Sequence, residues 1–143
     1  MAKCEMKMPN EFLDKLSKLE GRFDKAAPKI LQSGGKVVLS AMKANLEGRI
    51  GKDTKYPSRS KGDLLRSLGI TPALQDRNGE WNIRVGVGDS IDREGVPNAL
   101  KAQVLEYGKS GQKAKPWMKP ARRKARKPAV QAMEETLKKE LDL

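Results

Sequence analysis

The sequence predicts an α+β fold, in which a long N-terminal helix and a C-terminal helix pack on a small antiparallel sheet containing a β-hairpin. Apolar residues recur every three to four positions near both ends of the chain, which is the periodicity of an amphipathic helix. Between them, residues 80–87 alternate apolar and polar positions, as a half-buried strand does. The pair Asn78-Gly79 precedes that strand and indicates a tight hairpin turn.

The N-terminal helical pattern covers residues 10–33 and resumes from Val37 to about Arg49. Pro28 lacks a backbone N–H, so we expect a kink or a break there, and one long bent helix or two consecutive helices would both fit. Gly51 is a suitable stop. The apolar face consists of Phe12, Leu16, Leu19, Phe23, Ala27 and Ile30, then Val38, Ala41, Met42, Leu46 and Ile50.

The middle of the chain supplies the strands and a short helix. Residues 69–75 and 80–87 form the two arms of the hairpin, and residues 98–107 have helical spacing. The apolar positions of the second arm are Trp81, Ile83, Val85 and Val87, with Trp81 expected in the core, and those of the short helix are Leu100, Val104 and Tyr107.

The last helix is predicted from about Pro120, a good first-turn residue, to about residue 141. Pro128 is expected to interrupt it with a kink. Its apolar positions keep a four-residue step and are Ala121, Ala125, Ala129, Met133, Leu137 and Leu141.

All these elements fit one domain spanning residues 1–143. Hydrophobic residues make up 37% and charged residues 34%, so we expect a modest core that neighbouring copies complete. The segments are a helical segment 1–50, a loop 51–62, the hairpin and short helix 63–107, a basic arm 108–118 and the C-terminal helix 119–143.

The positive charge is concentrated near the C-terminal end. The net charge is +12, and residues 109–128 hold nine basic residues and no acidic one. Such a cluster suits phosphates or an acidic protein surface, while a solvated, partly mobile loop is the alternative. No Asn, Gln or Ser stands among the arginines to contact bases, which favours nonspecific contact. The candidate contacts are Lys113, Lys115, Lys119, Arg122, Arg123, Lys124, Arg126 and Lys127.

Catalytic groups are scarce. Histidine is absent and Cys4 is the only cysteine, so the usual general base and a disulfide framework are both missing. Asp89, Asp92 and Glu94 share one loop, but their spacing lacks the glycine and terminal glutamate of a calcium loop. No run is long and apolar enough to span a membrane. We therefore expect no enzyme, cofactor, metal site or membrane contact.

Trp117 and Met118 stand in a rigid basic segment without periodicity. Sequence reasoning leaves two interpretations open: the pair either folds back onto the domain or docks into a partner.

Two segments resemble signatures of a family of phage tail components. Pro57 followed by Gly62-Asp63-Leu64-Leu65-Arg66-Ser67-Leu68 is similar to its "proline, then Thr-Gly-x-Leu-x-x-Ser-Ile" stretch, with Lys61 in place of the threonine. Leu105-Glu106-Tyr107-Gly108 and Pro116-Trp117-Met118-Lys119-Pro120-Ala121 are similar to its second signature, with Trp117 in place of phenylalanine. The residues that carry the resemblance are Pro57, Gly62, Leu64, Ser67, Leu68, Glu106, Tyr107, Gly108, Pro116, Trp117, Met118, Pro120 and Ala121.

The family comprises neck and tail-completion proteins from the head–tail joining cluster of long-tailed phages and prophages. The resemblance implies a structural virion protein that forms a ring, hexameric in the family, in the neck of the virion after synthesis in the bacterial cytoplasm. Its partners would be further copies, the head connector, and a tail-tube or tail-terminator protein, with nonspecific contact to DNA. The alternative is a small nonspecific nucleic-acid-binding protein that uses residues 109–128.

Overall fold

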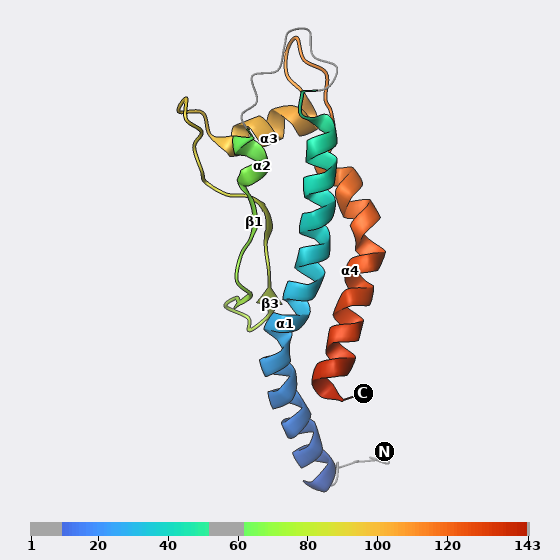
Figure 1. Cartoon of the computed structure of the whole chain (residues 1–143). Coiled ribbons are helices and arrows are strands. Elements are labelled where there is room, and N and C mark those ends of the chain that lie inside the picture. Colours follow the sequence, from blue (N-terminus) through green and yellow to red (C-terminus); the bar gives the residue numbers. More distant parts are fainter. Residues whose placement is uncertain (1–9, 52–61, 143) are drawn as a thin grey trace, which may run out of the picture.

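The computed structural model describes residues 10–51 and 62–142. Figure 1 shows two long helices side by side, with the strands beside the first of them and a short helix lying across the long axis. This arrangement confirms the predicted α+β fold. The elements are α1 (Asn10–Arg49), α2 (Asp63–Arg66), β1 (Leu68–Ile70), β2 (Leu74–Gln75), β3 (Trp81–Asn82), β4 (Val85–Val87), α3 (Asn98–Tyr107) and α4 (Met118–Leu141).

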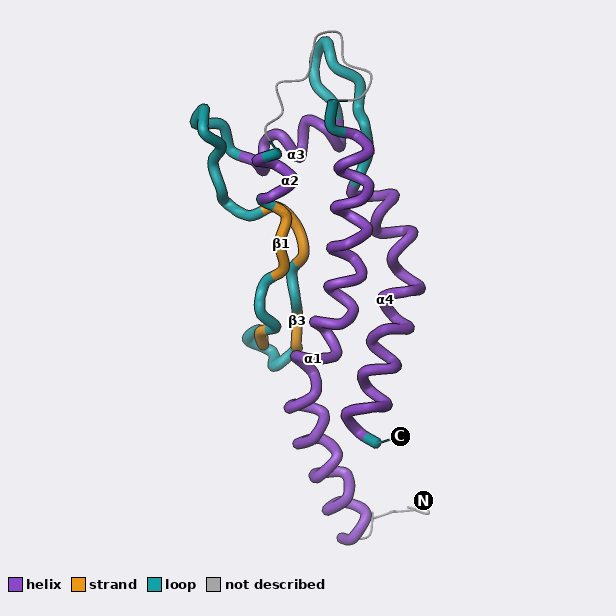
Figure 2. Tube along the Cα trace, in the orientation of Figure 1, coloured by secondary structure: helices purple, strands orange, loops and turns teal. Residues whose placement is uncertain are grey.

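The first 40 described residues form a single helix, so the alternative of two consecutive helices is wrong. Pro28 lies inside α1 without ending it. Ala26, Ala27 and Ile30, on either side of the proline, are buried. Burial of this face offsets the roughly 3 kcal/mol that an interior proline costs a helix. The axis of α1 does change direction between its upper and lower parts (Figure 2).

Helix α4 also continues through its proline, so Pro128 does not end the helix. Pro128 is exposed, whereas Ala125 and Ala129 beside it are buried. The four-residue apolar step is confirmed, since Ala121 and Leu141 are buried as well. The helix begins at Met118 rather than Pro120, because residues outside the helix cap its first turn, as shown below.

Helices α1 and α4 lie close together because small residues line their contact. A Cβ atom added at Gly34 would lie 2.7 Å from the Met133 side chain of α4, and one added at Gly35 would lie 2.5 Å from Ile70 of β1. The two glycines therefore let α4 and the hairpin approach adjacent faces of α1. At the far end, Lys29 pairs with Glu140 at 3.3 Å.

The predicted hairpin is confirmed, although each arm is divided into two short strands. β1 pairs with β4 and β2 pairs with β3, both antiparallel. In the turn, the Asp76 carboxylate accepts hydrogen bonds from the backbone N–H groups of Asn78 (2.8 Å) and Glu80 (2.9 Å). Gly79 adopts a φ of 79° there, which glycine tolerates without strain. Trp81 is half-buried, and its indole N–H donates to Asp24 of α1.

The apolar stripe predicted for residues 98–107 is wrong. Leu100 and Tyr107 are 51% and 71% exposed, whereas Asn98, Ala102 and Glu106 form the buried face of α3. A glutamate can occupy this face because its carboxylate finds backbone donors there.

The main core lies where the end of α1 meets α2, α3 and the start of α4. Its buried members are Met42, Leu46, Leu64, Leu68, Ala102, Trp117 and Ala121.

Candidate assembly interface

The start of α4 is held by a carboxylate from α3. Oε2 of Glu106 accepts hydrogen bonds from the backbone N–H groups of Trp117 and Met118, each at 2.8 Å, and Oε1 accepts one from Lys119 at 3.1 Å. The first N–H groups of a helix have no partner within the helix and carry its positive dipole end. Glu106 therefore acts as a cap from another element, and α4 contains no acidic residue in its own first turn.

The same contacts set the ionisation of Glu106. Burial by itself would raise the pKa of the carboxyl, but the hydrogen bonds from Met118, Trp117 and Lys119, together with the Lys119 charge, lower it. The net effect is a pKa below the ordinary value of 4.5. Glu106 thus carries its negative charge at neutral pH, where it stabilises the start of α4.

Trp117 belongs to the protein's own core. Its side chain is 0% exposed, and its Nε1–H donates to the carbonyl oxygen of Ala102 at 3.3 Å. Its own carbonyl oxygen accepts a hydrogen bond from Asn45 Nδ2 of α1 at 3.2 Å. Of the two interpretations left open by the sequence, the structure selects folding back, because Trp117 ties α4 to both α1 and α3.

The first signature meets the second in this core. Leu64 and Leu68 are buried in the same cluster as Trp117, and the Ser67 hydroxyl donates to the carbonyl of Leu64. Gly62 precedes α2 with a φ of 81°. Pro57 and most of the predicted loop 51–62 lie outside the described residues. In the second signature Ala121 is buried, Met118 and Pro120 are half-buried, and Pro116 and Tyr107 are exposed.

Gly108 connects α3 to the basic arm at a point where the backbone is crowded. Its φ is 77°, and a Cβ there would lie 2.7 Å from the backbone N of Ala114 and 2.9 Å from the carbonyl oxygen of Gln112. Lys115 N–H then bonds the carbonyl of Leu105 at 2.7 Å, which turns the arm back toward α3.

We expect Gly108→Ala to destabilise the fold by about 2 kcal/mol, because a side chain would add backbone strain and a clash with main-chain atoms. Thermal unfolding followed by circular dichroism measures the loss. Gly111→Ala is the matched control, since Gly111 has a similar φ of 79° but open space around its Cβ position. Equal losses in the two variants would show that the close approach at Gly108 has no energetic role.

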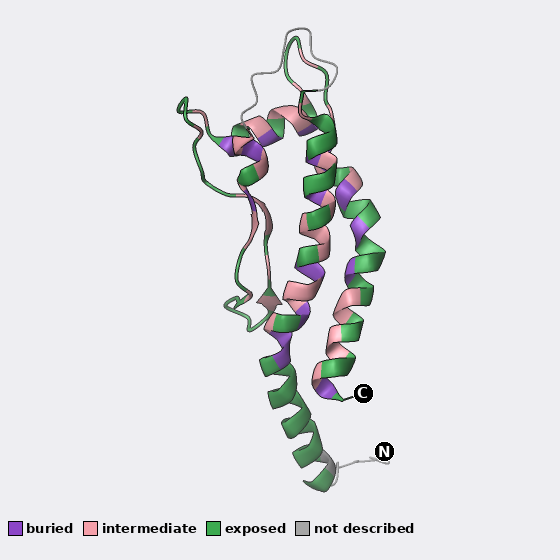
Figure 3. Cartoon of the chain, viewed as in Figure 1, coloured by how far each residue is buried: buried purple, intermediate pink, exposed green. Residues whose placement is uncertain are grey.

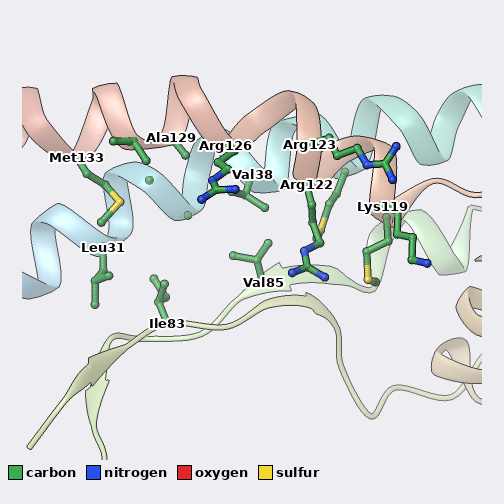
Figure 4. Close-up of a pocket in the computed structure, with 15 residues that line it drawn as sticks. Leu31, Val38, Ile83, Val85, Lys119, Arg122, Arg123, Arg126, Ala129 and Met133 are labelled. Carbon is green, nitrogen blue, oxygen red and sulfur yellow. The ribbon is translucent and has the colours of Figure 1, made fainter.

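A groove with an apolar floor and a basic rim runs along α4 (Figure 4). It encloses about 870 Å³ between α1, α4 and the hairpin. The Arg122 side chain extends from α4 toward Val85. The apolar lining includes Leu31, Val38, Ile83, Val85 and Met133, and the basic rim consists of Lys119, Arg122, Arg123 and Arg126.

Lys119 lies in the first turn of α4, where a cation interacts unfavourably with the helix macrodipole. Lys124 and Lys127 are exposed further along the helix, Lys113 is exposed in the arm, and Lys115 is half-buried. The Glu106 carboxylate offsets part of this charge.

Two features of this region were not predicted from the sequence. The groove combines α1, α4 and the hairpin, and no local pattern links these elements.

The second feature is the loop around Asp92, between β4 and α3. The Asp92 carboxylate accepts hydrogen bonds from the backbone N–H groups of Glu94 (2.9 Å) and Val96 (2.8 Å), and it pairs with Lys101. The Lys101 hydrogen bond, with those backbone bonds, lowers the pKa of Asp92. Within residues 10–51 and 62–142, no three acidic, histidine or cysteine side chains gather as a metal site would require.

None of the helices in the described ranges is both long and apolar enough to cross a bilayer.

Fold and site together define a small α+β protein whose core joins α1, α2, α3 and the start of α4, with a basic-rimmed groove beside it. The chain belongs to the family described as "Bacteriophage HK97-gp10, putative tail-component", whose model matches residues 10–108. The resemblance drawn from the two signatures is thereby confirmed. The match ends at Gly108, so the segment from Pro116 to Ala121 lies beyond it. No curated protein and no solved structure matches the chain.

Proposed function

We propose that the protein is a non-catalytic structural component of the virion neck, which completes the tail and joins it to the head connector as a ring. The observation that carries the proposal is membership of the phage tail-component family over residues 10–108. The commonest general base, histidine, is missing from the composition, and the chain has a single cysteine.

Two structural features support a role in assembly. The buried core is rich in alanine, with few large side chains fully buried, so much apolar surface stays outside it. Large apolar residues such as Leu16, Phe23 and Ile91 are exposed, and each is 41% exposed or more. Exposed large apolar side chains of this kind are available for burial by neighbouring copies.

Sedimentation velocity and negative-stain electron microscopy test the proposal, with the protein alone and mixed with tail-tube and connector proteins from the same genome. We expect discrete rings, either of the protein itself or together with those proteins. A protein that stays monomeric at high concentration and ignores those partners would contradict the proposal.

A second candidate function is nonspecific binding of nucleic acid. It is favoured by six cations exposed within the first ten residues of α4: Lys119, Arg122, Arg123, Lys124, Arg126 and Lys127. Contacts to phosphates alone would let DNA slide past.

If the basic face binds phosphates, affinity for a random DNA duplex falls steeply with salt, with a slope of about −0.9 per phosphate contact. The triple variant Arg122→Glu, Arg123→Glu, Arg126→Glu should then reduce affinity at least about 100-fold at low salt, and fluorescence anisotropy measures it. The control reverses three exposed cations elsewhere: Lys18→Glu, Lys25→Glu and Arg77→Glu. Equal binding by the two variants would exclude the basic face as a nucleic-acid site.

A further inference from the structure

Along the first sixteen described residues of α1, Asn10 to Lys25, the described side chains are exposed, and the part that precedes Arg22 extends past the rest of the described molecule. Figure 3 shows this part of the helix as exposed along its length. Leu13, Leu16, Leu19 and Phe23 are 41–44% exposed, although their spacing places Leu16, Leu19 and Phe23 on one face. Leu13, Leu16, Leu19 and Phe23 thus form a row of partly exposed apolar side chains, which we call the α1 stripe.

The α1 stripe continues a seam that is already buried within the chain. The next positions on the same face are Ala26, Ala27 and Ile30, which are buried. Helix α4 covers the seam and ends at Leu141, and the following Asp142 pairs with Arg22 at 3.0 Å. In the part of α1 that precedes Arg22, no described segment covers this face. The apolar face of α1 therefore extends beyond the end of α4.

We propose that the α1 stripe packs against the same stripe of neighbouring copies, with the helices parallel. The proposal rests on the proposed function, because it names the surface through which copies would meet in a ring. In heptad terms Leu16 and Phe23 occupy a positions and Leu19 a d position. The residue before each a position is basic, namely Lys15 and Arg22 at g, whereas Glu20 occupies e.

This charge pattern selects the parallel orientation. In parallel helices a g residue faces the e residue five positions later in the neighbour, so Lys15 of one copy would face Glu20 of the next. In antiparallel helices the g positions of the two copies face each other. Lys15 and Arg22 of one copy would then lie beside the same basic residues of the other and repel them. Leu13, at the other e position, widens the apolar face beyond a strict two-helix seam. That width suits helices arranged around an axis in more than two copies.

The α1 stripe is short, covering about two heptads, so a single helix pair would be weak by itself. In a closed ring the same contact repeats at each interface, and the copies strengthen one another's binding. The expected readout is therefore the concentration at which the full-length protein assembles, with its tail and connector partners present if they are required.

The apolar test uses the double variant Leu16→Glu, Phe23→Glu. It should raise the half-assembly concentration at least about tenfold, because charges would replace the contact face. The control, Leu74→Glu with Ile91→Glu, places two glutamates at apolar positions that are 62% and 64% exposed away from α1. Both variants should keep the wild-type circular dichroism spectrum, since all four positions lie outside the main core.

The charge test distinguishes the orientations. For parallel helices Lys15→Glu and Glu20→Lys each weaken assembly about threefold to fivefold, and the combination restores it to near the wild-type level. For antiparallel helices Lys15→Glu would strengthen assembly instead, which would overturn the proposal. Lys18→Glu, exposed at c on the outer side of the helix, is the control.

The outcomes separate the two proposals. Rings that form normally in every α1 variant would refute the α1 stripe as the interface and leave the proposed function standing. Failure of the wild-type protein to assemble, alone or with tail and connector proteins, would refute both.

Discussion

Replacing Trp117 by alanine is expected to lower the free energy of unfolding by about 4 kcal/mol. Trp117 is 0% exposed and fills the space between α1, α3 and the start of α4. Its removal leaves a cavity and also frees the Ala102 carbonyl, which accepts the indole N–H at 3.3 Å. Because small domains are stable by only about 5–15 kcal/mol, this loss is a large part of the total.

Urea unfolding followed by circular dichroism measures the change. Trp81→Ala is the matched control, because Trp81 is half-buried and should cost markedly less. Trp117→Phe keeps an aromatic ring and should cost about 1 kcal/mol, mainly the lost indole hydrogen bond. If Trp117→Ala and Trp81→Ala were equally stable, the indole could not anchor α4 as described.

Glu106→Gln is expected to lower stability at neutral pH by about 2–3 kcal/mol. The amide keeps the shape of the side chain. It replaces the charged carboxylate, whose two oxygens accept hydrogen bonds from three backbone N–H groups of α4, by a neutral group with one acceptor oxygen. It also removes a negative charge beside the first turn of α4, which has no acidic residue of its own. Thermal unfolding at pH 7 measures the difference, and Glu47→Gln, at an exposed position of α1, is the control.

The pH dependence provides a second and independent signature of Glu106. Its pKa in the folded protein lies below the ordinary value of 4.5, so the unfolded chain takes up the proton first as pH falls. The stability that the carboxylate provides is therefore complete above about pH 4.5 and is lost as pH falls through the folded pKa. The wild type should lose more stability than Glu106→Gln between pH 6 and about pH 3. Parallel pH profiles for the two proteins would contradict the capping role.

Local periodicity was sufficient to predict the helices and the hairpin, because each depends mainly on neighbouring residues. The positions of Ala125, Ala129 and Leu141 on α4, and the Asn78-Gly79 turn, are examples. At Pro28 the sequence leaves one bent helix and two consecutive helices open, because the cost of a proline is local, whereas the burial of Ala26 and Ile30 that offsets it depends on contacts distant in the sequence.

The candidate site was predictable as a set of residues but not as an arrangement. The resemblance singled out Glu106 and Trp117, yet the hydrogen bond between the Glu106 carboxylate and the Trp117 backbone has no sequence pattern. Helical spacing alone therefore predicts that Tyr107 is buried and does not predict burial of Glu106, because a buried carboxylate is favourable only with donors that another segment provides. The groove was missed for the same reason, since Val38 and Ile83 meet only in the folded chain.

The core residues determine the stability of the fold, and we propose that the exposed surfaces make the contacts with other molecules. Glu106 and Trp117 hold the start of α4 against α1 and α3, and this positions the basic side chains of α4 that border the groove. If the protein assembles as proposed, destabilising these contacts should weaken assembly indirectly, through loss of the fold. Charge changes at Lys15 or Arg122, which are exposed, should affect contacts while the fold remains intact.

Electron microscopy of particles produced by a phage whose copy of this gene is deleted tests the proposed role at the head–tail junction most directly. If the protein completes the tail and joins it to the head, filled heads and separate tails accumulate, and supplying the gene from a plasmid restores joined virions. A normal yield of complete, joined particles without the protein would contradict the role.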